Sequence, residues 1–462
     1  MDERGWVGAA GLAVLFALIG LRVPVALAML LVGVGGTFVL SLVAPFIRFL
    51  PYLEQFKSLF WSTLASYELS VVPLFILMGF LAAEAGLSRD LFRGLQALTG
   101  RVRGGVGMAA IGACAGFGAV CGSSIATAST MGRVALPELQ RLGYRDTLAT
   151  GTLAAGGTLG ILIPPSVALV IYAVVVEASI VTMFQAAVLP GLLAVAFFLA
   201  VIAIWVRRDR GVAPPADPLD AAERRHAIAR LAPVGGIFLA MILGLGMGLF
   251  TPTPAASVGV FLVLVYGLAL RRRGGGLDRT GIARAVKSTA VTAGMLYVII
   301  FAAEVLKGFF ARAGLPAALA DWAATTTLDP WLVLAAMLLA LVALGCFMES
   351  LSMILVVVPF FWPVLVELNG GDWATAGTAA FGLAALDLKI WFGILALVVV
   401  ELGLITPPVG LNVFAIHAVA PRVGMGTVFR GVLPFFAAEL VRVALLLAIP
   451  WLTLALPRLL AG

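Results

Sequence analysis

Apolar stretches long enough to cross a bilayer recur from one end of this sequence to the other, separated by short polar segments. Because a helix rises 1.5 Å per residue, about 20 apolar residues span a hydrocarbon core. The pattern predicts an all-α integral membrane protein with roughly eleven to thirteen crossings. The predicted spans are 7–21, a segment after Pro24, 71–83, 147–176, 183–206, 232–250, 254–270, 288–304, 331–365, 377–400, 401–419 and 430–455.

Composition supports this class and excludes several others. Hydrophobic residues make up 62% of the chain and charged residues 11%, whereas a soluble domain carries about 25% charged residues. The net charge of +7 comes from arginines in short loops, which is typical of membrane proteins and argues against nucleic-acid binding. The first six residues lack the positive charge of a signal peptide, so the first apolar run is expected to be retained.

The polar segments predict the topology. Segments 207–230 and 271–287 are both rich in arginine, and two predicted spans separate them. They should therefore lie on one face, and their charge predicts that this face is cytoplasmic. The TPTP turn at 251–254 should then face outward. Segment 207–230 is also the expected linker between a first half, 1–206, and a second half, 231–462.

The two halves resemble each other where helices should break. Residues 160–170 and 403–413 both read G-x-x-x-P-P-x-x-x-x-V. Proline removes an amide donor and clashes with the preceding helical turn, so two adjacent prolines free several carbonyls. One such motif would equally suit an ordinary kink or an external loop, but two matched copies favour broken helices at 147–176 and 390–420. The helix-breaking residues are Pro164, Pro165, Pro407 and Pro408.

A polar segment precedes each broken helix. Residues 121–130 and 345–352 are rich in small hydroxyl side chains and lie between apolar stretches. This arrangement predicts re-entrant hairpins at 104–143 and 331–365. The hydroxyls of Ser123, Ser124 and Thr127 are the better candidates for a site, whereas those of Ser129 and Thr130 suit hydrogen bonds within their own helix.

The chemistry of such breaks favours ion and anion binding. Freed carbonyls and hydroxyls are hard oxygen ligands that suit Na⁺, and the N-termini of half-helices suit a carboxylate. Matched interrupted segments in two halves point to the central site of a secondary transporter.

Two carboxylates are predicted at membrane depth, Glu349 and Glu401. Because a charge there costs about 2.5–3.5 kcal/mol or more, each should face a cavity or a partner. Either residue could help to bind cations or relay protons. Structural pairing with Arg133 or Arg442 is the alternative.

The chain resembles the large membrane subunit of tripartite ATP-independent periplasmic (TRAP) transporters, the DctM type, over nearly its whole length. The resemblance rests on the order and spacing of short motifs rather than on any one of them. These motifs are VPVA at 23–26, VPLF at 72–75, RGG at 103–105, GSS at 122–124, Pro137, GY at 143–144, IPPS at 163–166, FTPT at 250–253, MES at 348–350, FGI at 392–394 and TPPVGLN at 406–412.

The resemblance implies a sodium-coupled importer of small organic acids in a bacterial inner membrane. It implies a small membrane subunit and a periplasmic solute-binding protein as partners, and an elevator fold of inverted repeats with two hairpins. Na⁺ is the implied coupling ion, and no other cofactor is expected. The implied Na⁺ ligands are Ser123, Ser124, Gly160 and Ile163 at one site and Gly345, Gly403, Thr406 and Val409 at the other. The implied substrate contacts are Ser124, Thr127, Ser350, Ser352 and Asn412.

The chain departs from the family pattern at three positions. Pro254 replaces a Glu, Val399 replaces an Asn and Trp391 replaces a His. The last two lie beside the second broken helix and put the identity of the ligands there in doubt.

Two other functions are compatible with parts of this pattern. A stand-alone permease for ions or organic anions would share the repeat but need no partners. A membrane-embedded enzyme would need a nucleophile–base pair or metal ligands at membrane depth. The two histidines, His226 and His417, are far apart, and Cys114, Cys121 and Cys346 show no CxxC spacing. The chain also lacks a Walker motif, so neither an enzyme nor an ATP-driven pump is expected.

Overall fold

The structure, a computed structural model, describes residues 3–44, 46–214, 220–271 and 276–461. This part of the chain consists of α-helices, with one 3₁₀ turn at Glu68–Ser70 and no strand. Nine of the described helices are long and apolar enough to cross a membrane, or ten when one bent pair counts as a span. The predicted all-α, multi-pass architecture is therefore confirmed.

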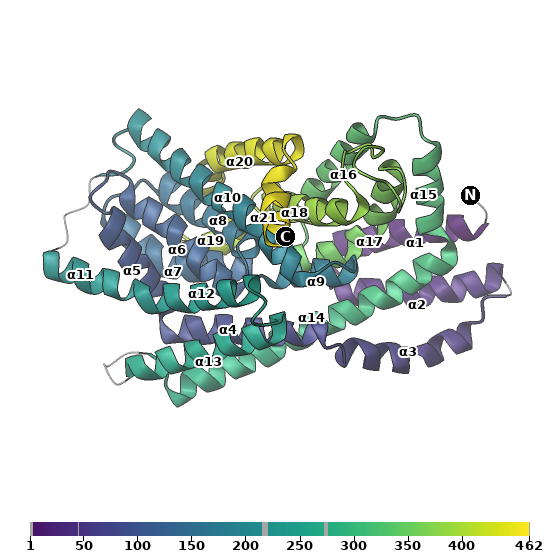
Figure 1. The fold of residues 1–462 in the computed structure, drawn as a ribbon, viewed down its shortest axis with the longest axis horizontal. Coiled ribbons are helices and arrows are strands. Elements are labelled where there is room, and N and C mark those ends of the chain that lie inside the picture. Colours follow the sequence, from purple (N-terminus) through teal and green to yellow (C-terminus); the bar gives the residue numbers. More distant parts are fainter. Residues whose placement is uncertain (1–2, 45, 215–219, 272–275, 462) are drawn as a thin grey trace.

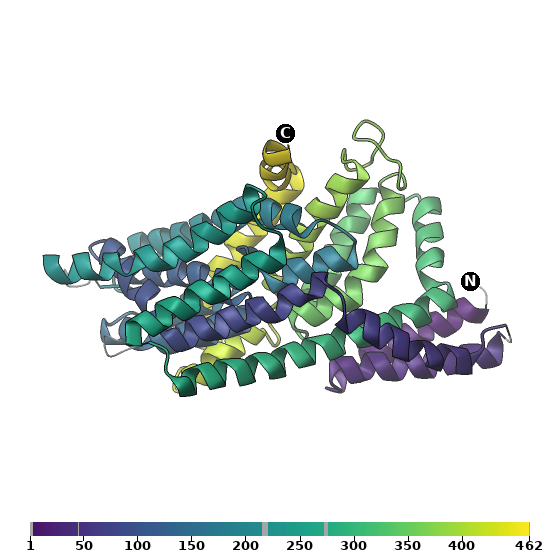
Figure 2. The ribbon, with the colours of Figure 1, turned by 60° about the horizontal axis from the view of Figure 1, so that its bottom comes forward.

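An outer layer of helices runs along the lower edge of Figure 1. The long helix α14 packs against α2 and α4, and α13 lies along α4. Figure 2 shows α14 extending along most of this side, with α1, α2 and α3 at one end. The outer layer comprises α1 Glu3–Gly20, α2 Val25–Val43, α3 Phe49–Leu64, α4 Val71–Ala85, α12 Leu231–Gly246, α13 Pro252–Arg271 and α14 Arg279–Ala313.

Two helical pairs occupy the segments predicted to be hairpins. The first is α6 Gly105–Cys121 with α7 Ser124–Arg141, and the second is α16 Pro330–Gly345 with α17 Ser350–Leu368. Gly122 ends α6 in the left-handed region, with φ 66°, which glycine adopts without steric cost. Ser123 then caps α7, because its Oγ accepts the Ala126 N–H at 3.4 Å.

Two interrupted helices occupy the segments with paired prolines. Helix α8 Asp146–Leu162 is followed by α9 Val167–Val175 at a bend of 46°. Helix α18 Ala385–Gly403 is separated from α19 Leu411–Val419 by a loop that holds Pro407 and Pro408. Each short helix contacts the hairpin of the other half, since α9 packs on α17 and α19 packs on α7. Both Pro–Pro peptide bonds are cis.

The remaining helices show where sequence reasoning failed. The predicted span 430–455 is wrong as a single element, because the chain breaks near Pro450 between α20 Met425–Ala448 and α21 Trp451–Ala461. Four helices went unpredicted because they lack a long apolar run: α3, α5 Leu87–Thr99, α11 Ala221–Ala229 and α15 Leu315–Thr325. Helix α11 falls within the linker predicted at 207–230, of which 215–219 lies outside the described residues.

Helix α10 Ile180–Arg208, which covers the predicted span 183–206, packs against α20 and α21.

Asp90 on α5 fixes the ends of two outer helices. Its buried carboxylate accepts a hydrogen bond from Arg230, where α12 begins, at 3.0 Å, and one from Tyr266, near the end of α13, at 2.8 Å. The start of α12 and the end of α13 therefore meet on one side of the molecule. The described parts of the arginine-rich segments that adjoin them therefore share this face, and the prediction that it is cytoplasmic rests on their positive charge.

Replacing Asp90 with Ala should destabilise the protein by about 1–3 kcal/mol, because a partly buried guanidinium and a phenol would lose their acceptor. The measurement is the thermal unfolding midpoint of the purified protein in detergent. Asp372→Ala is the matched control, because Asp372 is exposed on the loop after α17. Equal midpoints for the two variants would contradict a role for Asp90 in holding α12 and α13.

Candidate functional site

The two hairpins meet at one buried carboxylate, that of Glu401 near the end of α18. Glu401 is 1% exposed. Ser124, the first residue of α7, donates a hydrogen bond to its Oε2, and Ser350, the first residue of α17, donates to its Oε1 at 2.9 Å. Because both serines begin a helix, the carboxylate also lies at two helix N-termini, whose partial positive charge favours an anion.

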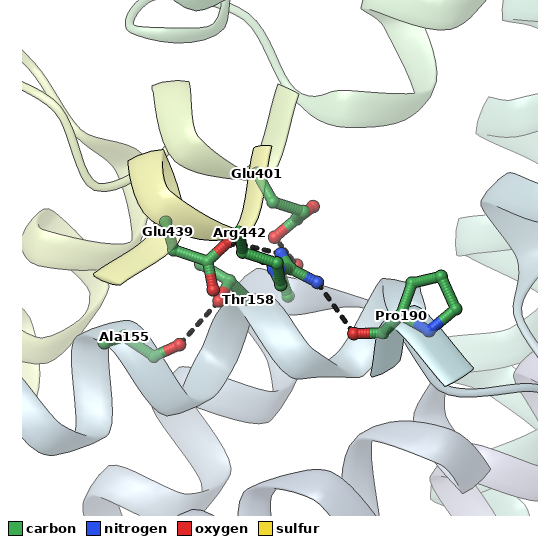
Figure 3. Close-up of polar contacts among 7 residues, drawn as sticks. Ala155, Thr158, Pro190, Glu401, Glu439 and Arg442 are labelled. Atoms are coloured by element: carbon green, nitrogen blue, oxygen red, sulfur yellow. Dashed lines mark hydrogen bonds and ion pairs between the residues drawn. The ribbon is translucent and has the colours of Figure 1, made fainter. Parts of the chain in front are cut away.

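A buried ion pair on α20 lies close to this carboxylate. Arg442 bonds to Glu439, with Nε 2.9 Å from Oε2, and donates to the carbonyl of Pro190 on α10 at 3.1 Å. Figure 3 shows the pair beside Glu401 and above Thr158 on α8, and Glu401 lies within electrostatic range of both charges. The site therefore holds two acidic groups and one basic group out of contact with water.

Neither Arg133 nor Arg442, the two predicted partners, forms an ion pair with Glu349 or Glu401 in the described part of the chain. Arg442 pairs with Glu439, and Arg133 is exposed on α7. Sequence reasoning missed Glu439, although an E-x-x-R spacing inside an apolar run was a detectable signal. Glu349 is half-buried at the start of α17, and its side chain caps no helix.

At the first helix break, backbones approach closely enough to require glycine. A Cβ on Gly118 of α6 would lie 2.4 Å from the Cα of Gly160 on α8. A Cβ on Gly160 would lie 2.7 Å from Thr127 Oγ1 and 3.1 Å from the carbonyl oxygen of Ser123. The structure thus brings Ser123, Thr127 and Gly160 together. Ile163 ends α8, half-buried, and its N–H bonds within the helix.

The second break repeats this glycine contact. A Cβ on Gly403 of α18 would lie 2.7 Å from the Cα of Gly345 on α16. Cys346, which follows, has its Sγ 3.5 Å from the carbonyl oxygen of Pro407. The predicted ligands Gly345 and Gly403 are therefore in contact. Thr406 lies in the loop after α18, and its hydroxyl donates back to the Leu402 carbonyl in the last turn of that helix at 2.6 Å. Val409 is half-buried in the same loop.

Asn412 links the second half to the first. Its Nδ2 donates to the Ala154 carbonyl at 3.4 Å. A Cβ on Gly157 would lie 3.1 Å from that Nδ2 and 3.0 Å from the carbonyl oxygen of Ser124. Asn412 Oδ1 and Thr127 Oγ1 are buried and have no hydrogen-bond partner among the described residues. Buried polar atoms seldom lack partners, so these two oxygens are available to an ion, a water or a ligand.

Three further side chains lie near or beside the site. Ser352 is buried on α17, two residues after Ser350, and forms no hydrogen bond to Glu401 within the described ranges. Ser129 bonds to its own helix, at the Ala126 carbonyl, as predicted. Trp391 is buried, and its Nε1–H donates to the Leu446 carbonyl at 2.9 Å, so it fills the core. Across the described chain, no group of three metal-ligating side chains occurs.

Residues 12–452 match the family described as "Tripartite ATP-independent periplasmic transporter, DctM component". The chain belongs to this family. It is 34% identical over 398 residues to the C4-dicarboxylate TRAP transporter large permease DctM of Pseudomonas aeruginosa, covering 86% of this chain and 88% of that protein. It is 31% identical over 400 residues to the sialic acid TRAP transporter large permease SiaM of Vibrio cholerae, covering 86% and 88%.

A solved structure supports the fold alone. The YdaH transporter of Alcanivorax borkumensis aligns with a TM-score of 0.61 at 16% identity, covering 92% of this chain and 97% of that one. The chain is thus a multi-pass large permease and not an enzyme. Large permeases of this family work with a periplasmic binding protein and usually with a small membrane subunit.

Gly403→Ala should lower transport at least tenfold, because the new methyl group would overlap Gly345 and push α16 away from α18. Uptake into proteoliposomes at equal protein content measures this. Gly294→Ala is the matched control, since a Cβ at this helical position on α14 meets nothing within 4 Å. Normal uptake by Gly403→Ala would show that the close approach of the two helices is dispensable.

Proposed function

We propose that this large permease imports small carboxylates from the periplasm into the cytoplasm across the bacterial inner membrane, driven by Na⁺. The observation that carries the proposal is the convergence of two helix N-termini and two serine hydroxyls on a buried carboxylate. Donors in this arrangement suit a carboxylate of the substrate as well as that of Glu401. The two relatives are named for C4-dicarboxylate and sialic acid, both of which are acids.

The proposed substrate position lies between the hairpin breaks, beside Glu401. Ser124, Ser350 and Asn412 line it, and Thr127 lies nearby with an unpartnered hydroxyl. A substrate carboxylate that takes the serine hydrogen bonds would displace Glu401, whose own charge would then turn toward Arg442. Such an exchange would couple the arrival of substrate to a rearrangement of both hairpins.

Two Na⁺ sites are proposed at the two glycine contacts. At the first, the Ser123 carbonyl and the Thr127 hydroxyl converge on Gly160 and supply oxygen ligands, with Ser124 and Ile163 alongside. At the second, the carbonyl oxygens of Val342 and Val400 lie beside the Gly345–Gly403 contact. The following loop adds the carbonyls of Leu404 and Thr406, which lie near Gly410, and contains Val409. Each Na⁺ that moves inward across 100 mV releases about 2.3 kcal/mol, which can drive accumulation of an anion.

Elevator-type movement is part of the proposal. The hairpins and interrupted helices pack on one another across the two halves, while α2, α4, α13 and α14 form a separate layer. A rigid inner unit beside a distinct outer layer is the arrangement that sliding transport requires. A stand-alone permease for ions or organic anions would use the same inner site, so the requirement for partners separates the two functions.

Uptake of labelled dicarboxylates and sialic acid should require both Na⁺ and the binding protein. The assay uses the large permease with its small membrane subunit in proteoliposomes, with an inward Na⁺ gradient and with K⁺ in its place. Uptake that ignores the binding protein would favour the stand-alone permease. Uptake driven by a proton gradient would overturn the sodium sites and make Glu349 and Glu401 the coupling candidates.

Glu401→Gln should reduce the uptake rate at least tenfold, because an amide offers one acceptor oxygen where Ser124 and Ser350 need two. Uptake and the thermal unfolding midpoint are measured together, so that loss of fold is distinguished from loss of transport. Glu367→Gln is the control, since Glu367 is exposed at the end of α17. A Glu401→Gln variant with normal uptake would contradict the role assigned to this carboxylate.

A further inference from the structure

A cavity that Glu401 does not line opens on the arginine-rich face. Its volume is about 940 Å³, and its walls come from α5, the loop after it, the second half of α7, and α11 with the residue that follows. Seven arginines and three carboxylates line it, with His226 at one side. No function assigned above uses this cavity.

Few of these arginines are neutralised. Arg141 pairs with Glu138 at 2.7 Å, and Arg230 pairs with Asp90 at 3.0 Å. Arg93 is only within electrostatic range of Glu138. The other four lining arginines form no ion pair or hydrogen bond through their guanidinium groups with any described residue. These are Arg89, Arg101, Arg133 and Arg224.

The positive-inside rule of membrane proteins does not explain why these arginines gather around one cavity. That rule places arginines on the cytoplasmic face, and it is satisfied by exposed residues such as Arg103 and Arg208, which do not line the cavity. Seven arginines and only three carboxylates around one cavity leave an excess of positive charge, which adds mutual repulsion. A ligand with several negative charges would remove that repulsion and bind the guanidinium groups through paired hydrogen bonds.

We propose that this cavity binds a phosphate-bearing anion. Guanidinium groups match phosphate oxygens in geometry and charge, and basic pockets between helices on the cytoplasmic side suit phospholipid headgroups. Helix α5 has the form of an interfacial helix, with Leu87 and Leu91 buried and Arg89 and Arg93 exposed. The phosphate belongs either to an anionic lipid headgroup or to a soluble pyrophosphate-like anion, and the chemistry of recognition is the same.

Because of where the cavity lies, a ligand bound in it would affect transport. Arg133 lies on α7, whose first residue, Ser124, holds Glu401, whereas the facing wall comes from α5 and α11. A bound anion would therefore tie the first hairpin to helices outside it. This consequence rests on the movement proposed above, but the binding itself does not.

The test compares lipid retention and anion binding on the full-length permease. Native mass spectrometry of protein purified from mixed cardiolipin and phosphatidylcholine should show at least tenfold preferential retention of cardiolipin. Arg93→Gln/Arg133→Gln should lower that preference at least fivefold. The control Arg103→Gln/Arg208→Gln removes the same charge from the same face and should retain the preference. Circular dichroism and the thermal midpoint establish that each variant is folded.

A second arm identifies the source of the phosphate. Inorganic pyrophosphate is titrated into wild-type protein in neutral detergent, with and without cardiolipin, by calorimetry. Cardiolipin retention that pyrophosphate does not displace assigns a lipid headgroup. Pyrophosphate binding that weakens with salt, and that Arg133→Gln alone reduces, assigns a soluble anion. The proposal is overturned if the wild-type protein shows neither preference nor binding, or if the control variant loses cardiolipin as fully as the cavity variant.

Discussion

The buried carboxylate of Glu401 is the constraint on which the central arrangement depends. A carboxyl group out of water costs several kcal/mol unless hydrogen-bond partners replace its hydration. Ser124 and Ser350 supply those partners, and each begins the second helix of a different hairpin. Satisfying one carboxylate therefore brings together parts of the chain that lie in separate halves, and it places two positive helix ends at the same point.

Two close backbone contacts between glycines also hold the helices of this interior together. Gly118 against Gly160, and Gly345 against Gly403, hold the first helix of each hairpin on the interrupted helix of the same half. The two breaks still differ in their surroundings, since Pro164 and Pro165 are buried whereas Pro407 and Pro408 are exposed. Matched sequence motifs thus occupy unequal environments.

Helix α7 connects this interior to the arginine-rich face. Its first residue holds the buried carboxylate, and Arg133, further along, lines the arginine-rich cavity between α7, α5 and α11. Asp90 anchors that same region, because it joins α5 to the ends of α12 and α13. Charge at the membrane surface and hydrogen bonding at membrane depth are therefore linked through one helix.

The sequence by itself determined the elements whose signal is local. Apolar runs predicted the membrane class, and paired prolines at 164–165 and 407–408 predicted where helices stop, because proline acts on its own turn. It did not predict the amphipathic helix α5, whose apolar face needs neighbours to bury it. Nor did it predict the short helix α11, which is polar and has no buried residue. Only the tertiary structure decided that Glu401 binds Ser124 and Ser350, and that Arg442 pairs with Glu439 instead. Local patterns place each group at a depth in the membrane, but a buried charge takes its partner from whichever helices pack around it, and the packing of distant segments sets that choice.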